Sequence, residues 1–260
     1  MKPRPCIGAA ALALVLSCSR AAPSNPQVVL ILPSSREVPA NLLRISIRFA
    51  TQVEGAVLPR VSLWRAHGRE IQQPFLEQEL WSPDGKVLTI MLHPGRVKSG
   101  LNARDTMGPI LLAGDDIFLA FDGHPIKRWR VGPKDDAGPN TSKWKLHSVQ
   151  AESLQPLVVA LDGPIDGQNA DYLAIADASG RRVAGRVRLA AGENVWMFAP
   201  DVAWRVGAYE LVARGTLEDP AGNRLGSRFE TSIDSPAGPA IDAVVPFAVG
   251  PRRTSGLFRR

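Results

Sequence analysis

The chain has 260 residues, with 31 Lys and Arg against 25 Asp and Glu, which gives a formal net charge of +6. Two of the basic residues stand at positions 2 and 4 and four more follow position 251, so the body between them is neutral. A neutral body argues against a nucleic-acid-binding domain. Cysteine occurs twice, at Cys6 and Cys18. The chain beyond them therefore has no disulfide, thiol nucleophile or thiolate metal ligand.

The first eighteen residues, "MKPRPCIGAAALALVLSC", have the layout of an export signal. Lys2 and Arg4 supply a short basic start, and an uncharged apolar run follows from position 7 to position 16. The run is too short to remain in a bilayer as a spanning helix. We therefore expect this segment to direct export and then to be removed.

The end of that segment, "LVLSC", resembles a bacterial lipoprotein signal, in which the chain is cut before the cysteine and a diacylglycerol is attached to its sulfur. The resemblance implies a signal peptide over 1–17, lipid attachment at Cys18 and a tether over 18–26. Ser19 after the cysteine implies sorting to the outer membrane. The alternative is an ordinary secretory peptide that is cut near Ala21.

Alternation of apolar and polar residues dominates the body and predicts β-strands. In "LLRISIRFA" at 42–50, the apolar residues stand at every second position from 43 to 49. No stretch keeps an amphipathic helical period over three turns. The spacing therefore predicts an all-β sandwich rather than βαβ units. Shorter runs of the same kind follow at 86–92, 117–122, 172–177, 185–190, 195–200 and 208–215.

The strand pattern occurs twice in the same order, which predicts two tandem domains. "AHGREI" at 66–71 returns as "ASGRRV" at 178–183, and "LLAGDDIFLAFDG" returns as "WRVGAYELVARG". The expected segments are a first sandwich over 27–132 with an insertion near 98–110, a linker over 133–145, a second sandwich over 146–235, and a basic, disordered tail over 236–260.

The second repeat carries a Gly-x-Tyr-x-Leu strand, an Asp-x-x-Gly-Asn turn and a Phe-x-Thr pair. This set resembles a bacterial Ig-like domain of the S-layer type, also called SbsA-like, over residues 146–233. The resemblance implies a β-sandwich spacer or adhesion module and no catalysis. The first repeat has lost most of these residues, so its Ig-like assignment rests on the repeat. The matching residues are Gly207, Tyr209, Leu211, Asp219, Gly222, Asn223, Phe229 and Thr231.

Glu218, Asp219 and Asn223 gather side-chain oxygens around a Pro-Ala-Gly core between two apolar runs. Pro220 suits an early turn position, Gly222 and Asn223 tolerate a positive φ, and an Asp side chain accepts backbone N–H bonds. A calcium site needs six to eight oxygens, and adjacent residues at a strand end point to opposite faces. We interpret the stretch as a turn, with a calcium site or an acid–base cluster as the alternatives.

Side chains with catalytic or metal-binding chemistry are scattered along the chain. Each histidine is more than twenty residues from the next, and none has metal-ligand spacing to another. We therefore expect no catalytic residue, no metal and no cofactor. The six tryptophans either fill the cores or stack on sugars, and we favour the cores. They are Trp64, Trp81, Trp129, Trp144, Trp196 and Trp204.

The connection over 92–114 concentrates basic side chains in an otherwise neutral body. Long loops on rigid sandwiches often carry binding residues, so we expect His93, Arg96, Lys98 and Arg104 to form a recognition loop for an anionic or glycan partner. The alternative is a decorated loop that covers a sheet edge.

These features together indicate an envelope lipoprotein that binds, adheres or scaffolds without catalysis. Its expected partners are the membrane, through the lipid anchor, and an envelope protein or glycan, with no nucleic acid. Its expected location is the bacterial cell envelope, at the outer membrane. The alternatives are a carbohydrate-binding module and an accessory subunit of an envelope enzyme.

Overall fold

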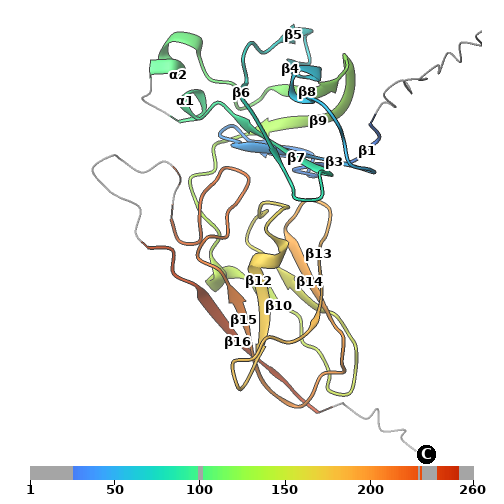
Figure 1. The fold of residues 1–260 in the computed structure, drawn as a ribbon. Coiled ribbons are helices and arrows are strands. Elements are labelled where there is room, and N and C mark those ends of the chain that lie inside the picture. The colour runs from blue at the N-terminus through green and yellow to red at the C-terminus, as the bar shows by residue number, and fades with distance from the viewer. Residues whose placement is uncertain (1–25, 99–101, 228, 230–238, 252–260) are drawn as a thin grey trace, which may run out of the picture.

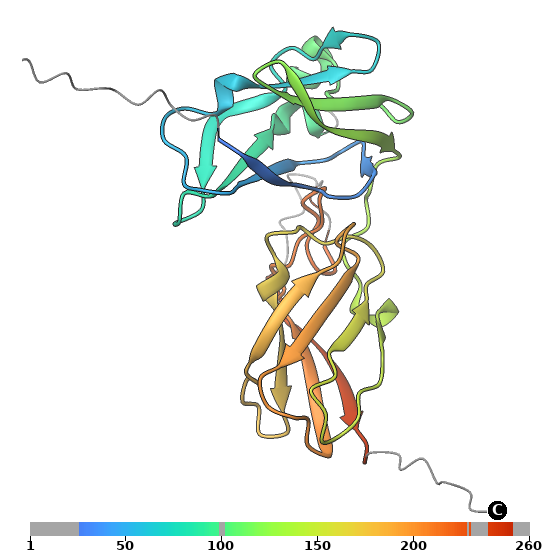
Figure 2. The same cartoon turned by 90° about the vertical axis from the view of Figure 1, so that its right-hand side faces the viewer.

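The computed structural model describes residues 26–98, 102–227, 229 and 239–251. These residues form two β-sandwiches that follow one another along the chain and meet end to side (Figure 1). The described chain begins at the first sandwich and ends at the far tip of the second (Figure 2). Cys18 and the signal segment lie outside the described residues.

The first sandwich has a four-stranded and a five-stranded sheet. The strand orders are β1-β3-β7-β6 and β2-β9-β8-β4-β5. Strand β2 runs parallel to β9, and the other strand pairs of both sheets are antiparallel. The bounds are β1 (Val28–Leu32), β2 (Glu37–Pro39), β3 (Arg44–Phe49), β4 (Val61–Arg65), β5 (Arg69–Glu70), β6 (Phe75–Trp81), β7 (Val87–Leu92), β8 (Asp116–Phe121) and β9 (His124–Gly132).

The second sandwich has a four-stranded and a three-stranded sheet. The strand orders are β10-β11-β14-β13 and β12-β15-β16, and the pairs are antiparallel. The bounds are β10 (Lys145–Leu146), β11 (Leu157–Ala160), β12 (Leu173–Asp177), β13 (Gly185–Leu189), β14 (Val195–Pro200), β15 (Gly207–Ala213) and β16 (Ala243–Val249).

The strand order itself identifies both sandwiches as Ig-like. When the seven strands of the second sandwich are lettered A to G, its sheets read A-B-E-D and C-F-G, which is the order of a constant-type immunoglobulin domain. The first sandwich repeats this order and adds β2 beside strand G and β5 beside strand C. The predicted fold class, all-β with two tandem Ig-like sandwiches, is confirmed.

Each sandwich closes around its own apolar core. In β3 the predicted alternation places Ile45, Ile47 and Phe49 in the first core, where all three are buried. Trp129 joins that core, and Trp196 is fully buried in the second. The inward residues of two facing sheets make the core of a sandwich, so the period of two sets the fold here.

The extra segment of the first sandwich lies between β7 and β8. It forms two short helices, α1 (Pro94–Val97) and α2 (Asn102–Met107). Three single turns of 3-10 helix stand elsewhere, at η1 (Leu58–Arg60), η2 (Thr141–Lys143) and η3 (Ala170–Tyr172). None of the helices in the described ranges has the length and apolarity needed to cross a membrane.

The turn predicted around Asp219 is confirmed. The Asp219 carboxylate accepts bonds from the backbone N–H and the side-chain Nδ2 of Asn223, at 2.9 and 2.8 Å. The Gly222 N–H donates to the Asp219 carbonyl at 3.0 Å and closes the turn. The sequence did not predict its burial, because Asp219 is only 2% exposed.

The predicted end of the second sandwich at 235 is wrong. Strand β16 lies within the range that was assigned to a tail, and it pairs with β15 from Gly207↔Val249 to Ala213↔Ala243. The Phe-x-Thr pair that was expected in the last strand precedes it. Phe229 lies outside any strand, and Thr231 and the tail from 252 to 260 lie outside the described residues.

The second sandwich should fail to fold in a chain that ends at residue 238. Phe247 of the lost strand packs against the rings of Trp204 and Tyr209, with centroids 6.2 and 5.6 Å away. A chain that ends after Pro251 should match the full chain in near-UV circular dichroism and in limited proteolysis. Equal protease resistance of the two truncated chains would show that β16 is dispensable.

Candidate functional site at the junction of the two sandwiches

The linker is held from both sides by asparagine side chains. Asn41 of the first sandwich donates its Nδ2 to the Asp135 carbonyl at 2.8 Å and accepts the Asp135 N–H at 2.9 Å. Asn223 of the second sandwich donates to the same carbonyl at 2.8 Å. Asn41 and Asn223 are 3% and 2% exposed, so water does not compete for these bonds. A single linker residue thus ties the two sandwiches together.

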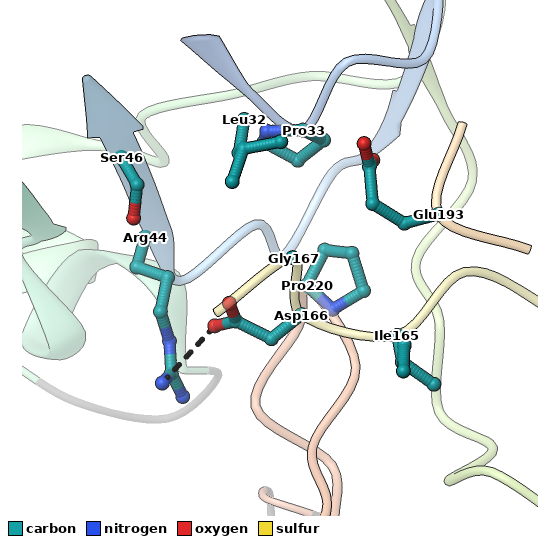
Figure 3. A pocket seen from close by; sticks show the side chains of 9 residues that line it. All are labelled: Leu32, Pro33, Arg44, Ser46, Ile165, Asp166, Gly167, Glu193 and Pro220. Atoms are coloured by element: carbon teal, nitrogen blue, oxygen red, sulfur yellow. Dashed lines mark ion pairs between the residues drawn. The ribbon is translucent and has the colours of Figure 1, made fainter. Parts of the chain in front are cut away.

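Arg44, the first residue of β3, pairs with two carboxylates of the second sandwich. Its Nη1 lies 3.2 Å from the Asp166 Oδ2, as Figure 3 shows, and its Nη2 bonds to the Glu218 carboxylate. One residue earlier, the Leu43 N–H donates to the Pro220 carbonyl at 2.9 Å. Because the Asp166 side chain is 4% exposed, removing Arg44 leaves a charge largely out of water. Such a loss typically costs about 3–5 kcal/mol.

Ser34, just after β1, makes a second connection. Its backbone N–H donates to both Glu193 carboxylate oxygens, at 3.2 and 3.0 Å, and its hydroxyl accepts the Gly192 N–H at 2.8 Å. Lys127 Nζ donates to the Ser34 carbonyl at 2.7 Å. The turn between β13 and β14 is therefore hydrogen-bonded to the segment that follows β1 of the first sandwich.

The second sandwich makes these contacts with one end only, through the connections that follow β11, β13 and β15. Two glycines allow the close approach. A Cβ added at Gly222, where φ is +82°, would lie 2.5 Å from the Leu43 Cδ2, and a Cβ added at Gly167 would lie 2.6 Å from the Leu32 Cδ1. Both distances are too short for any residue other than glycine without a shift of the neighbouring side chain. The cavity of about 10 Å³ that remains beside Arg44 is about the size of one water molecule. The junction is closely packed.

Three carboxyl groups at the junction have raised pKa values, each mainly because burial disfavours the charged form. Burial raises the pKa of Asp219 to about 7, although the bonds from Asn223 lower it. Burial also raises the pKa of Asp166 against the opposing charge of Arg44. The same cause raises the pKa of Glu193, against the bonds from Ser34.

An open groove runs beside the junction, between β1 and β13, and we call it the inter-sandwich groove. Its volume is about 450 Å³, within the range of ligand-binding clefts. Apolar side chains from both sandwiches line it, and two arginines join them. The lining includes Leu30, Leu32, Arg48, Val187, Arg188 and Leu189.

The expectation that Arg96 faces a partner is wrong. Arg96 is 4% exposed, and its guanidinium donates to the carbonyls of Gly108, Gln72 and Gln73 at 3.0, 2.5 and 3.0 Å. Burial lowers the pKa of Arg96. A guanidinium surrounded by backbone carbonyls holds the 92–114 segment against the loop before β6, and it has little capacity for a ligand.

The other three residues of the expected recognition loop do not form a common open surface with it. Arg104 Nη1 donates to the Val97 carbonyl at 2.9 Å and to the preceding carbonyl at 3.0 Å. His93 is half-buried at the start of α1. Lys98 Nζ lies 4.1 Å from the centroid of the Phe229 ring, a cation–π contact between the sandwiches. The Arg104 side chain thus serves loop structure, and the Lys98 side chain serves packing.

Four of the six tryptophans lie in the cores of the two sandwiches. Trp129, Trp144, Trp196 and Trp204 are buried, which confirms the core interpretation for these four. Every indole N–H of the six donates to an acceptor within the protein. Trp64 and Trp81 are half-buried on the first sandwich.

The arrangement at the junction is suited to holding and binding. Its carboxylates are engaged by Arg44, by Ser34 and by the turn of Asp219. Across the described part of the chain, no group of three or more His, Cys, Asp or Glu residues can hold a metal ion. No motif in the sequence singles out Arg44, Asp166 or Glu193. The sequence gives one indication of the role of Arg44, which is that a charged residue begins the most regular apolar strand.

No family model and no curated protein matches the sequence. Among solved structures, a chimeric titin Z1Z2 is 14% identical with a TM-score of 0.26, covering 73% of this chain and 91% of that one. An L,D-transpeptidase from Mycobacterium smegmatis is 13% identical with a TM-score of 0.27, covering 64% and 62%. SGBP-B from Bacteroides uniformis is 9% identical with a TM-score of 0.29, covering 88% and 50%. At these scores the Ig-like assignment rests on the strand order alone.

Arg96→Ala should destabilise the first sandwich by roughly 2–4 kcal/mol, because several buried carbonyls lose their donor. Urea unfolding followed by tryptophan fluorescence measures the effect. Arg69→Ala, at an exposed position on the edge strand β5, is the matched control and should leave the midpoint unchanged. Equal midpoints for both variants would mean that the Arg96 bonds contribute nothing net.

Asp219 should make stability fall as the pH rises. A carboxyl whose pKa is about 7 when folded and about 4 when unfolded adds stability that is complete below pH 4 and is lost as the pH passes 7. The contribution is at most about 4 kcal/mol. The melting temperature should therefore drop from pH 5 to pH 8, and it should drop less in Asp219→Asn. Identical slopes for the two proteins would contradict the assignment.

Proposed function

We propose that this protein is a lipid-anchored, non-catalytic binding and scaffold protein of the bacterial envelope. The observation that carries the proposal is the junction, which fixes two Ig-like sandwiches to each other and leaves the inter-sandwich groove open beside it. Sandwiches joined by a bare linker are expected to move relative to one another. A fixed pair instead presents one surface of constant shape, as a scaffold requires.

The lipid anchor is the second part of the proposal, and the "LVLSC" ending supports it. An extended chain spans at most about 3.5 Å per residue, so the tether over 18–26 reaches roughly 30 Å. A lipid on Cys18 would hold the first sandwich near a membrane surface, with the second sandwich beyond it. The S-layer type of the Ig-like domain, taken from the residues around Tyr209, belongs to the same proposal.

Binding is favoured over catalysis because the charged groups at the junction face one another. Arg44, Asp166 and Glu218 form one ion-paired set, and the Glu193 carboxylate accepts the Ser34 N–H. A catalytic group needs access to a reacting atom. The groove offers apolar walls and unpaired basic groups, which suit recognition.

Cys18→Ser should abolish incorporation of a radiolabelled fatty acid and move the protein from the membrane fraction to the soluble fraction or leave it uncleaved. The lipid is attached through the sulfur, so a hydroxyl in its place cannot carry it. Cys6→Ser, within the segment that is removed, is the matched control and should be labelled normally. Unchanged labelling and membrane partitioning of Cys18→Ser would overturn the lipid anchor.

A further inference from the structure

The inter-sandwich groove has one wall from each sandwich. Leu30 and Leu32 of β1 form part of one wall, and Val187 and Leu189 of β13 form part of the other. Leu30 is among the exposed large apolar residues of the described chain. Leu32 is only 9% exposed, so a partner gains mainly by covering Leu30, Val187 and Leu189, at roughly 25 cal/mol for each Å² of apolar surface removed from water.

Strand β13 presents an open backbone edge to this groove. It is the last strand of its sheet, with β14 as its neighbour. The Ala190 N–H donates to the Val195 carbonyl, and the Asp201 N–H donates to the Ala184 carbonyl. The backbone N–H and C=O groups of the even-numbered residues of β13 therefore face β14. Bonding direction alternates along an antiparallel strand. Val187 and Leu189 therefore direct their N–H and C=O groups away from β14.

The groove also carries positive charge that the protein does not neutralise. Arg48 and Arg188 are both exposed, and among the described residues neither guanidinium group has an ion-pair or hydrogen-bond partner. Glu193, the acid that lines the groove, is already held by the Ser34 N–H. Two unpaired guanidinium groups beside apolar walls favour a ligand that has carboxylates as well as apolar side chains.

We propose that the inter-sandwich groove binds an extended acidic segment of a partner protein, which pairs as an added strand with the open edge of β13. The outward groups of Val187 and Leu189 would supply the main-chain bonds. Apolar side chains at every second position of the segment would enter the groove, and Asp or Glu side chains would meet Arg48 and Arg188. The inference rests on the proposed binding function and names its partner.

The contacts at the junction hold the walls of the inter-sandwich groove in place when no partner is bound. Ser34 and Leu32 stand at the groove on the side of the first sandwich, and the bonds between Ser34 and Glu193 fix them relative to β13. A groove whose walls are already in place loses less conformational freedom on binding. Edge strands that carry arginine usually avoid pairing with other strands. An acidic segment removes that obstacle, whereas a basic or neutral segment does not.

The test uses the full mature chain, immobilised in detergent, and a phage-displayed library of random decapeptides. Selected peptides should alternate apolar residues with polar ones and should be enriched in Asp and Glu. Synthetic copies should bind at least tenfold more weakly to the double variant Arg48→Ser/Arg188→Ser. Arg186→Ser is the matched control, because Arg186 is exposed on the same strand but does not line the groove. It should bind like the unaltered chain.

Hydrogen exchange followed by NMR locates the added strand. The amides of Val187 and Leu189 should exchange quickly in the free protein and slow at least tenfold when a selected peptide is bound. The proposal is overturned if no peptide is selected, if the double variant binds as well as the control, or if these two amides stay unprotected. Each of these results leaves membrane attachment through Cys18 to be judged separately, because fatty-acid labelling does not depend on the groove.

Discussion

One guanidinium group organises the junction. Arg44 is the first residue of a buried strand, and it meets two carboxylates from different loops of the second sandwich. A charge removed from water is stable only when its partners are in place. The strand of the first sandwich and the loops with Asp166 and Glu218 must therefore reach their positions together. The relative placement of the sandwiches is thus coupled to the folding of the loops that face it.

This constraint decides which surfaces remain for recognition. In antibody variable domains, loops at one end of the sandwich form the binding site. Here the corresponding end of the second sandwich is occupied by the first sandwich, through Glu193, Pro220 and the asparagine bonds to Asp135. The free surface moves to the side, where the edges of two sheets meet. The Ig-like strand order is kept, and the place where a partner fits is different.

The period of two was sufficient to predict the strands around β3 and the all-β fold class, and the turn chemistry of Pro220 and Gly222 predicted the Asp219 turn. The period could not predict β16, because Pro246 weakens the strand pattern and is tolerated only at a sheet edge, where β16 lies. The basic character of the 92–114 connection suggested that Arg96 faces a partner. The sequence could not show its burial, because the carbonyls of Gly108 and Gln72 that bind this guanidinium lie 12 and 24 residues away in the chain. Arg44 was missed for the same reason. Its partners belong to the other domain.

The parallel pairing of β2 with β9 has a mechanical consequence. The described chain begins on the side of the first sandwich and ends at the far tip of the second (Figures 1 and 2), so tension that passes beyond β1 enters β2 from its start and leaves β9 at its end. Because the strands run in the same direction, that tension slides them past each other and loads the bonds from Glu37↔Arg130 to Pro39↔Gly132 at once. An antiparallel hairpin would open one bond after another. The first sandwich therefore resists stretching where the chain leaves for the linker.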